Sequence, residues 1–393
     1  MKERLKTLVL DANAFGWKEV AADTTVLGIL RRKQYPTLPP RLRTWPILRG
    51  LKARYEALSY VADWREALCA SPALDVRVCN ITNLADYAAC LRAIRDFDLV
   101  IVLHSAAGDS MTVLLKTVRR LRRRRGKLIA FIGNEYDLMA EKMKFLNLVE
   151  ADYVCSQLPI ESARWLYADC SGTQVLAMPH ALNPKVYRPA PLSGRAVDLG
   201  FIGATYPNFI GDVERNHLIQ EVRARSSSWG LTCDIREYNI ARTDWATFLS
   251  RSGGTVGGEA GSYYLDRRGE ILASAKAFQK AHPKASFDEL YDEIFKTPSV
   301  EYVSGKCISS RHFEAIGTKT CQILLEGEYN GLLHAGAHYI SVRKDLSNLD
   351  DAIRMFKDES IRGAIANRTY EYVIDQHTHA HRARSLLDSV ETS

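Results

Sequence analysis

Short apolar runs alternate with stretches of helical spacing through the first half of the chain. The run Asp98-Leu-Val-Ile-Val-Leu-His104 has no polar alternation, which is typical of a strand buried on both faces of a parallel sheet. Stretches such as 85–94 and 111–125 repeat apolar positions at the spacing of an amphipathic helix. Strand and helix in alternation predict a parallel sheet with helices on both faces. The expected strands of this half are 7–10, 76–81, 98–104, 127–133, 151–155 and 173–178.

A segment dense in proline and glycine, 184–194, separates this set of elements from a second one. The segment 263–302 within the second set is polar and has helical spacing. Two α/β domains in tandem bind ligands in the cleft at the carboxyl ends of their sheets. We therefore expect a first domain over 1–190 and a second over 195–370. The expected strands of the second domain are 197–202, 232–236, 322–325 and 338–341.

Composition and charge exclude several classes of protein. The 393 residues are 46% hydrophobic and 25% charged, which excludes disorder, collagen and a coiled coil as descriptions of the whole chain. No apolar run reaches the roughly 18 residues of a membrane span. Basic residues near the N-terminus resemble the start of a signal peptide, but Asp11 and Asn13 interrupt the apolar stretch that follows. These features predict a cytoplasmic protein.

Three patterns suggest metal or redox chemistry, and each has a simpler interpretation. The eight cysteines include no C-x-x-C pair, so reduced and mostly buried thiols are expected. The sequence His377-Thr-His379-Ala-His381 offers metal ligands, but no acidic or cysteine partner is near in sequence, which favours a solvated face of the last helix. Asp96-Phe-Asp98 precedes a strand instead of following one, so it is interpreted as a helix-to-strand turn. No metal is expected.

A basic run extends from Lys116 to Lys127, with eight basic residues in twelve, and includes Arg122-Arg-Arg-Arg125. One interpretation is the exposed C-terminal end of a helix, where cations suit the helix dipole. Another is a patch that binds anionic lipid headgroups at the inner face of the membrane, or nucleic acid. The net charge of +7 is compatible with either partner. Basic and aromatic residues in a proline-rich loop extend the run: Arg31-Arg-Lys33, Arg41, Arg43 and Trp45.

The strongest local signal is Ser310-Arg-His-Phe-Glu-Ala-Ile-Gly317. A carboxylate at Glu314 can accept hydrogen bonds from both hydroxyls of a ribose, and the guanidinium of Arg311 can bind a phosphate through two hydrogen bonds. The alternative is an ordinary Arg–Glu pair, three residues apart, on a surface helix. From these residues alone, both interpretations stand.

This stretch resembles the C-terminal domain of the GT-B glycosyltransferases, in the branch related to group 1 transferases and to spore-maturation CgeB-like proteins. The resemblance covers about half of the chain, and its motifs occur in the family's order. The segments that carry it are Met178-Pro-His-Ala-Leu-Asn183, Asp198-Leu-Gly-Phe-Ile-Gly203, Gly257-Gly-Glu-Ala-Gly-Ser262, Ser310-Arg-His-Phe-Glu314, His338-Tyr-Ile-Ser341 and residues 377–382.

The resemblance implies a GT-B fold: a Rossmann-like acceptor domain, a nucleotide-sugar-binding domain, a cleft between them and a helix over 371–393 that returns to the first domain. In group 1 transferases two glutamates bracket the donor sugar and the ribose. Glu314 matches the second, but Lys306 stands where the first is expected. Glu259 resembles the first glutamate, and we infer that the insert 263–302 separates the two halves of the motif.

The resemblance also implies a set of site residues. Gly203-Ala-Thr-Tyr206 follows a strand at the place where similar enzymes bring backbone N–H groups to the diphosphate. The catalytic candidates are His104 and Glu259. The candidates for nucleotide-sugar binding are Gly203, Thr205, Arg311, His312, Glu314 and Tyr339, and those for the acceptor side are Asn134, Glu135 and Asp137.

The function that the resemblance implies is transfer of a hexosyl or related unit from a nucleotide-diphosphate sugar, of the UDP type, to an acceptor hydroxyl. The acceptor would be a glycan, a lipid-linked or another hydroxyl compound, in bacterial surface glycan or glycoconjugate synthesis. Transfer is expected without a metal or other cofactor, and with retention of the anomeric configuration. Three alternatives stay open: a sugar-nucleotide epimerase or hydrolase of similar fold, a nucleic-acid-binding protein, and a nucleic-acid-glycosylating protein.

Overall fold

The computed structural model describes residues 3–12, 25, 59–108, 110–191, 194–237, 240 and 242–391. Contacts divide the chain into two compact units. Unit 1 comprises Met1–Met178 with Leu265–Glu270 and Val300–Val303, and unit 2 comprises the remaining residues. The predicted loop extension at Arg31–Lys33, Arg41, Arg43 and Trp45 lies outside the described residues.

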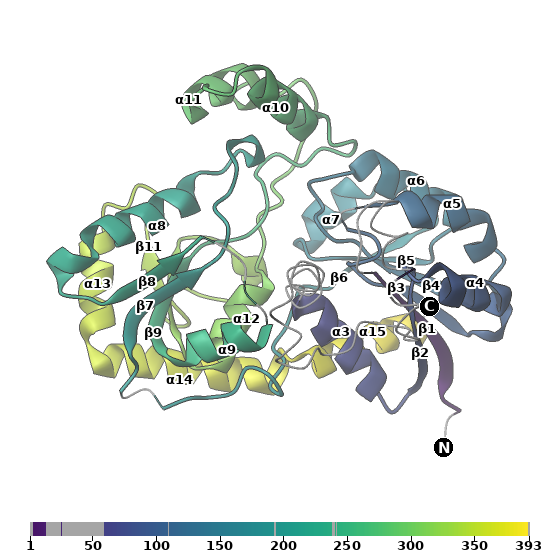
Figure 1. Ribbon diagram of the computed structural model, residues 1–393, viewed down its shortest axis with the longest axis horizontal. Coiled ribbons are helices and arrows are strands. Elements are labelled where there is room, and N and C mark those ends of the chain that lie inside the picture. The colour runs from purple at the N-terminus through teal and green to yellow at the C-terminus, as the bar shows by residue number, and fades with distance from the viewer. Residues whose placement is uncertain are drawn as a thin grey trace. The chain divides into compact units, whose positions relative to one another are not determined.

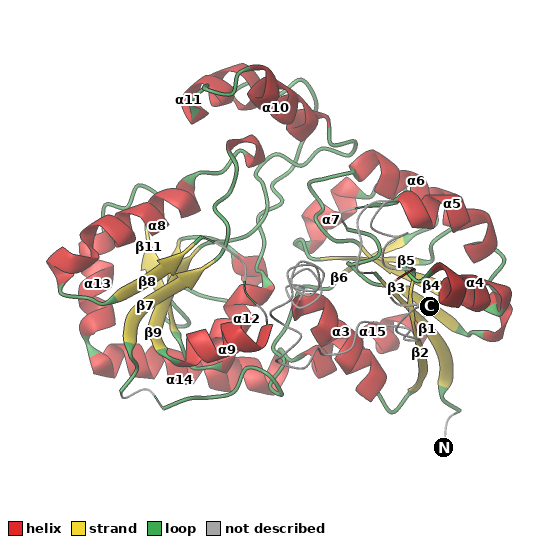
Figure 2. Cartoon of the chain, in the orientation of Figure 1, coloured by secondary structure: helices red, strands yellow, loops and turns green. Residues whose placement is uncertain are grey.

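Unit 1 is a parallel six-stranded sheet in the order β2-β1-β3-β4-β5-β6. Helices flank the sheet, as Figure 2 shows in red around the yellow strands. Its strands are β1 Leu5–Asp11, β2 Leu74–Asn80, β3 Leu99–Val102, β4 Lys127–Phe131, β5 Tyr153–Ser156 and β6 Gln174–Ala177. Its helices are α3 Ser59–Ala70, α4 Leu84–Arg92, η2 Ile94–Asp96, α5 Thr112–Leu121, α6 Met139–Val149 and α7 Ile160–Leu166.

Unit 2 is a parallel five-stranded sheet in the order β11-β10-β9-β7-β8 (Figure 1). Its strands are β7 Val197–Ile202, β8 Cys233–Arg236, β9 Ser252–Gly257, β10 Cys321–Leu325 and β11 Ile340–Val342. Its helices include α8 Glu214–Arg225, α9 Arg242–Ser250, α12 Ser310–Gly317, α13 Leu349–Lys357, α14 Glu359–Gln376 and α15 His379–Glu391. Shorter helical turns are η3 Asn208–Ile210, η4 Ser226–Trp229 and η6 Tyr329–Gly331.

The two parallel sheets confirm the predicted fold class, which is two Rossmann-like α/β units as in the GT-B fold. Each predicted strand coincides with an observed one to within a few residues, but β9 was missed. Three of the six residues in its sequence, Ser-Gly-Gly-Thr-Val-Gly, are glycines, which are rare in strands. The reason is close packing, because a Cβ on Gly254 would lie 2.4 Å from the Phe356 ring. Glycine at that position makes room for α13 against the sheet.

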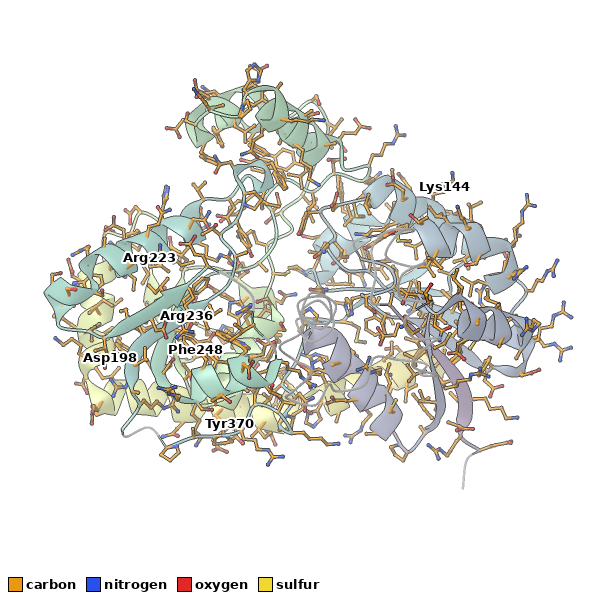
Figure 3. The ribbon with its side chains drawn as sticks, viewed as in Figure 1. Lys144, Asp198, Arg223, Arg236, Phe248 and Tyr370 are labelled. Carbon is orange, nitrogen blue, oxygen red and sulfur yellow. The ribbon has the colours of Figure 1, made fainter. Side chains whose placement is uncertain are left out.

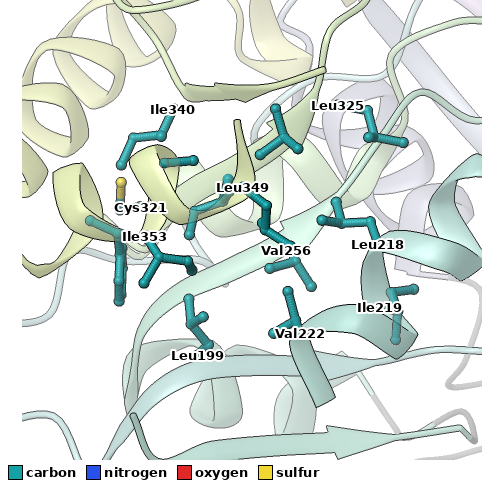
Figure 4. Packing of buried hydrophobic residues seen from close by; sticks show 14 of the residues in the cluster. Leu199, Leu218, Ile219, Val222, Val256, Cys321, Leu325, Ile340, Leu349 and Ile353 are labelled. Atoms are coloured by element: carbon teal, nitrogen blue, oxygen red, sulfur yellow. The ribbon is translucent and has the colours of Figure 1, made fainter. Parts of the chain in front are cut away.

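The core of unit 2 lies between its sheet and the helices α8 and α13 (Figure 4). Leu199 and Val256 come from neighbouring strands of the sheet, and Leu218 and Ile353 come from the two helices. All four are at most 4% exposed. Burying a leucine or isoleucine side chain of this kind contributes about 1.5–3 kcal/mol, so this layer holds the sheet edges in place for the site.

The polar insert predicted over 263–302 is helical, as expected from its spacing. It contains α10 Glu270–Ala281, α11 Phe287–Leu290 and the π-helical turn η5 Tyr291–Phe295. The segments that lead into and out of the insert pair antiparallel through Ala260 with Cys307, and Leu265 with Val303. This pairing brings residues on either side of the insert into direct contact.

Two further sequence-based expectations are tested by these elements. Asp98 follows η2 and its carboxylate accepts a hydrogen bond of 2.9 Å from the Lys6 backbone N–H, which confirms the helix-to-strand turn. Within the described part of the chain, none of the helices combines the length and the apolar composition that crossing a membrane requires.

Candidate functional site

The strand order of unit 2 reverses between β7 and β9. In open parallel sheets, ligands bind beyond the carboxyl ends of the strands at such a reversal. The two segments that leave the sheet at this point are Gly203-Ala-Thr-Tyr206 after β7 and Gly258-Glu259 after β9. Both segments contain residues that the sequence predicted as site residues.

Two arginines hold the segment after β7 by its carbonyl groups. Arg311 Nη1 donates to the Ile202 carbonyl at 2.5 Å, and Arg215 Nη2 donates to the Ala204 carbonyl at 2.7 Å. The Arg215 guanidinium lies 3.4 Å from the centre of the Tyr206 ring. The Arg311 guanidinium lies 4.6 Å from the centre of the indole ring of Trp245 in α9.

Neither guanidinium forms an ion pair with a carboxylate of the described residues. Arg215 Nε is moreover buried without a hydrogen-bond partner there. A buried donor without an acceptor is costly, typically about 1–3 kcal/mol. Two cations that share no carboxylate, beside a loop at the sheet reversal, form a site suited to an anion.

Gly203 and Thr205 line the same segment. A Cβ on Gly203 would lie 3.2 Å from the Phe201 ring, which is a tight contact, and 3.8 Å from Arg311 Cζ, which is ordinary van der Waals contact. The Gly203 N–H is bonded to the Arg236 carbonyl at 3.0 Å, which fixes the start of the loop on β8. Figure 3 labels Arg236, whose guanidinium lies 5.9 Å from the centre of the Phe248 ring of α9. Thr205 is half-buried.

Glu314 lies on α12 and is only 3% exposed. Its Oε2 accepts a hydrogen bond of 2.7 Å from the indole N–H of Trp245 on α9. The ring of Trp245 in turn packs against Arg311. The carboxylate and the guanidinium that the sequence placed on one helical turn are therefore both organised by Trp245, which the sequence analysis did not identify.

His312 occupies the N-terminal turn of α12. Its Nδ1 accepts a hydrogen bond of 3.0 Å from the Ser309 backbone N–H, which completes the helix cap. Burial lowers the pKa of His312 to about 4, and the charges of Arg215 and Lys306 act in the same direction. Its imidazole is therefore neutral near pH 7.

Glu259 and Lys306, which are 47 positions apart in sequence, are brought together because the segments that flank the insert pair with each other. Lys306 Nζ lies 2.5 Å from Asp212 Oδ2 and donates to the Glu259 backbone carbonyl at 3.1 Å. Glu259 Oε1 accepts a hydrogen bond of 2.7 Å from the Tyr329 N–H. Burial raises the pKa of Glu259, although the hydrogen bond from Tyr329 and the charge of Lys306 oppose that change.

Tyr339 belongs to the hydrophobic cluster on the other face of the sheet of unit 2 and is 1% exposed. Its ring centre lies 5.1 Å from that of Tyr329, and the ring of Tyr329 in turn contacts His312 at 5.2 Å. Tyr339 therefore packs behind the site residues His312 and Glu259.

In unit 1 the strand order reverses between β1 and β3, and His104 follows β3. Its side chain is 1% exposed and packs against Phe131 and Trp64, with ring centres 5.2 and 6.4 Å away. A Cβ on Gly108 would lie 2.5 Å from the His104 carbonyl, so the loop folds tightly over this histidine.

Asp11, at the end of β1, is the residue that the sequence analysis missed at this reversal. It is 2% exposed, and its Oδ1 accepts hydrogen bonds from Ser105 Oγ at 2.6 Å and from the Ala12 N–H at 2.8 Å. Its other oxygen pairs with Arg65. Strand order would have identified Asp11 as a candidate. A polar residue at the carboxyl end of the first strand lies at the point where the strand order reverses.

The predicted acceptor-side residues Asn134, Glu135 and Asp137 follow β4, in a loop that the buried Lys142 holds by its backbone. Lys142 Nζ donates to the carbonyls of Gly133, Asn134 and Asp137 at 2.6, 2.9 and 2.6 Å.

The Glu135 carboxylate is hydrogen-bonded to residues at the end of β5 and beyond it. It accepts hydrogen bonds from Ser156 Oγ at 2.6 Å, Tyr167 Oη at 2.7 Å and the Gln157 N–H at 3.1 Å. Burial raises the pKa of Glu135, although these hydrogen bonds oppose the change. Glu135 therefore connects the loops after β4 and β5.

The histidines near the C-terminus do not form a solvated helix face, so that prediction is wrong. His377 and His379 are 9% and 3% exposed. Burial lowers the pKa of His377 to about 4 and that of His379 well below its usual value, so both are neutral. The sequence pattern did not show that the backbone at His377 and His379 is hydrogen-bonded to the backbone of Leu182.

The eight cysteines, all within the described residues, form no disulfide bond, and most of them are buried, as predicted. Among the described residues, one group offers the geometry of metal ligands, namely Cys79, Asp86 and Cys90. The contact with the Cys90 thiol, followed by burial, raises the pKa of Cys79. Both effects favour the neutral thiol, which is a poor metal ligand, and Asp86 also faces Arg77 at 3.4 Å.

Comparison with known proteins agrees with the resemblance noted in the sequence. Residues 260–388, about a third of the chain, match the family model described as "Glycosyl transferase-like". This range, which lies mostly in unit 2 and contains α12 and Lys306, is therefore similar to glycosyltransferases. No curated protein sequence matches the chain.

Several solved structures are similar to this chain along most of its length. HepE of Anabaena, in complex with UDP and glucose, matches 99% of this chain and 100% of its own length, with 10% identity and a TM-score of 0.48. Sucrose-phosphate synthase of Thermosynechococcus elongatus matches 99% of both chains, with 11% identity and a TM-score of 0.48. T4 phage BGT, in complex with its UDP-glucose substrate, matches 97% of both chains, with 9% identity and a TM-score of 0.48. Likenesses at such identities and TM-scores carry no argument about function.

Proposed function

We propose that the protein is a glycosyltransferase that moves a sugar from a nucleotide-diphosphate sugar, of the UDP type, to an acceptor hydroxyl in surface glycan or glycoconjugate synthesis. The observation that carries this proposal is the pair Arg215 and Arg311. Their guanidinium groups share no carboxylate within the described residues and flank the loop at the sheet reversal of unit 2. The match of residues 260–388 to a glycosyl transferase-like family supports it.

In this proposal the diphosphate lies against Gly203, Thr205 and the two arginines. As the bond from the sugar to the diphosphate breaks, negative charge develops on the leaving phosphate oxygen. Fixed guanidinium groups stabilise such charge without rearrangement, so transfer proceeds without a metal. Glu314 accepts the ribose hydroxyls, with Trp245 holding its carboxylate in orientation. Neutral His312 contributes a hydrogen-bonding imidazole instead of a third cation.

The remaining roles follow the family resemblance. Glu259, in unit 2, is the candidate for contact with the donor sugar, and His104, in unit 1, is the second catalytic candidate. Asn134, Glu135 and Asp137 line the acceptor side, on a loop whose conformation Lys142 fixes. Transfer retains the anomeric configuration. The enzyme works in the cytoplasm, at the inner face of the membrane.

The experiment that tests this proposal is calorimetric titration of UDP into the protein and into two variants. Arg311→Ala removes a charged hydrogen-bond donor and should weaken binding by roughly 10- to 100-fold, as expected for hydrogen bonds between charged groups. Arg354→Ala is the matched control, because Arg354 is an exposed arginine of the same unit that pairs with Asp351. Equal affinities of the parent and Arg311→Ala for UDP would refute the anion site.

Turnover of labelled sugar nucleotides, with and without acceptors, then defines the reaction. A glycosyltransferase forms a labelled acceptor and releases the nucleoside diphosphate. Free sugar released without an acceptor would identify a hydrolase, and an isomerised sugar nucleotide would identify an epimerase. Either result would replace the transferase proposal and leave the anion site intact.

A further inference from the structure

The basic run of unit 1 contains arginines of two kinds, which the structure separates. Arg124 is structural: its side chain is 8% exposed, and it bonds the Val149 carbonyl at 2.7 Å and Asp152 Oδ2 at 3.0 Å. It therefore caps the C-terminal end of α6, where carbonyl groups lack partners. Arg122 pairs with Glu150 at the same end. These two arginines hold α5 against α6.

The other arginines of this region point outward. All are exposed, and none pairs with a carboxylate within the described part of the chain. They come from α4, from η2 and from the C-terminal end of α5, and the Arg95 guanidinium donates to the Arg123 carbonyl at 3.3 Å, which joins these elements. We call them the arginine surface, and they are Arg92, Arg95, Arg119, Arg120, Arg123 and Arg125.

The helix α5 divides its residues between core and surface. Its apolar positions Val113, Leu114, Val118 and Leu121 are at most 8% exposed, whereas Arg119 and Arg120 lie outside. The neighbouring helix α6 adds a cation, Lys144, which Figure 3 shows projecting outward. So many like charges on one surface repel one another, and the repulsion is relieved when an anionic partner binds.

The apolar neighbours of the arginine surface favour a lipid over a nucleic acid. Leu148, near the end of α6, is 45% exposed and precedes Val149, whose carbonyl Arg124 bonds. An exposed leucine among cations is typical of a surface that meets headgroups and inserts an apolar side chain beside them. The nearby Tyr87 is 2% exposed and bonds Thr117, so it offers no face for stacking a base.

We propose that the arginine surface, with Leu148, docks unit 1 onto a membrane rich in anionic lipid. This proposal names the residues and the class of lipid that would account for the membrane location proposed above. It does not depend on glycosyl transfer. Each basic residue near an anionic leaflet contributes about 1 kcal/mol to binding. Removing four of them should therefore lower the apparent partition coefficient by roughly 10²- to 10³-fold.

The test is sedimentation of the full chain with vesicles of phosphatidylcholine alone and of phosphatidylcholine with 30% phosphatidylglycerol. The test variant is Arg119→Gln/Arg120→Gln/Arg123→Gln/Arg125→Gln, which leaves the structural Arg122 and Arg124 in place. The matched control removes the same charge from exposed positions of unit 2, at Arg251, Lys280, Lys284 and Arg384. A third variant, Leu148→Ser, separates the apolar contribution from the charge.

The proposal expects the parent and the control to sediment with the anionic vesicles and not with neutral ones, and the test variant to stay in solution. Leu148→Ser should weaken vesicle binding several-fold and leave retention on heparin unchanged. Equal sedimentation of the test variant and the control would overturn the proposal. The proposal would also be overturned if the parent did not sediment with anionic vesicles but bound duplex DNA with a steep salt dependence. That result would identify a surface that binds nucleic acid. The test variant should bind UDP with the same affinity as the parent. The vesicle experiment therefore tests the membrane proposal, and the UDP titration tests the donor site independently.

Discussion

Lys306 and Asp212 form a buried ion pair, with Nζ 2.5 Å from Oδ2 and side-chain exposures of 8% and 1%. Lys306 stands where the group 1 pattern has a glutamate, so its amine cannot accept hydrogen bonds from a sugar. Instead, the pair connects the chain after β7 with the chain after the insert, and the same amine holds the backbone of Glu259. The altered motif thus has a structural role that the residue type alone did not indicate.

The first prediction concerns this pair. Lys306→Met leaves Asp212 charged and buried without its partner, which typically costs about 3–5 kcal/mol of unfolding free energy. Urea denaturation measures the loss. The double variant Lys306→Met/Asp212→Asn removes both charges and should recover much of it. Equal destabilisation by the single and double variants would show that the two charges do not act as a pair.

The second prediction concerns Glu314. Glu314→Ala should weaken binding of UDP by roughly 1.5–3 kcal/mol, the range for hydrogen bonds to charged groups. Trp245→Phe keeps the carboxylate but removes its indole donor at 2.7 Å. That variant should bind UDP more weakly than the parent and more tightly than Glu314→Ala, as calorimetry can measure. Unchanged UDP affinity in Glu314→Ala would mean that the carboxylate stabilises the fold and does not bind the nucleotide.

The third prediction concerns acid stability. Burial holds the pKa of His312 at about 4, whereas the unfolded chain returns it to about 6.5. Between these values the unfolded chain binds more protons, so the stability contributed by neutral His312 is complete above pH 6.5 and is lost as the pH falls toward 4. Burial lowers the pKa of His180 to about 3 and that of His377 to about 4, which acts in the same direction.

Urea midpoints between pH 7.5 and pH 4.5 measure this dependence. His312→Gln keeps a side-chain acceptor for the Ser309 N–H but cannot be protonated. Its midpoint should fall less steeply with decreasing pH than that of the parent. Parallel curves for the two proteins would show that His312 does not titrate differently in the folded and unfolded chains.

The fold was predictable because both sheets are parallel and several of their strands contain short, uninterrupted apolar runs. The run at 98–104 is an example, since burial on both faces leaves no room for polar alternation. Strand β9 was not predicted because the reason for its glycines is a contact between distant parts of the chain, namely the packing of Gly254 against the Phe356 ring of α13. Its absence from the expected strands also hid the reversal between β7 and β9, which is the feature that locates the site.

The sequence pointed to candidate site residues in two ways: Arg311 and Glu314 share one helical turn, and Gly203 and Glu259 lie in segments that resemble a known family. Arg215 and Trp245 have no motif of their own, and only the folded chain brings them to Arg311 and Glu314. The same limit applied to the basic run, where sequence did not distinguish Arg124, which caps α6, from Arg123, which is exposed. Both the pairing of segments across the insert and the capping of α6 by Arg124 depend on contacts between residues that are distant in sequence. Local sequence patterns do not predict such contacts.

The fourth prediction concerns the loop after β4. Lys142→Met removes the ammonium that three carbonyls share, and each buried acceptor left without a donor costs about 1–3 kcal/mol. Thermal unfolding should show a large loss of stability. Lys144→Met is the control, because Lys144 is exposed on the same helix. A similar small effect in both variants would contradict the proposed positioning of Asn134 and Asp137 by Lys142.

The last prediction separates two roles of Glu259. Its carboxylate accepts the Tyr329 N–H at 2.7 Å, so it stabilises the start of the turn η6 whether or not it contacts a sugar. A glutamine can still accept that hydrogen bond through its amide oxygen, but it lacks the charge.

Glu259→Gln should therefore fold like the parent and bind UDP within about twofold, while turnover falls by roughly 10-fold or more if the charged carboxylate acts in the transition state. Glu259→Ala removes both contributions and should lower the unfolding free energy as well, by about 1–3 kcal/mol for the unpaired N–H. Initial rates, calorimetry and urea denaturation on the same preparations resolve these effects. If Glu259→Gln turns over at the parent's rate and only Glu259→Ala is impaired, the carboxylate caps the turn and the sugar-contacting group must be sought elsewhere in unit 2.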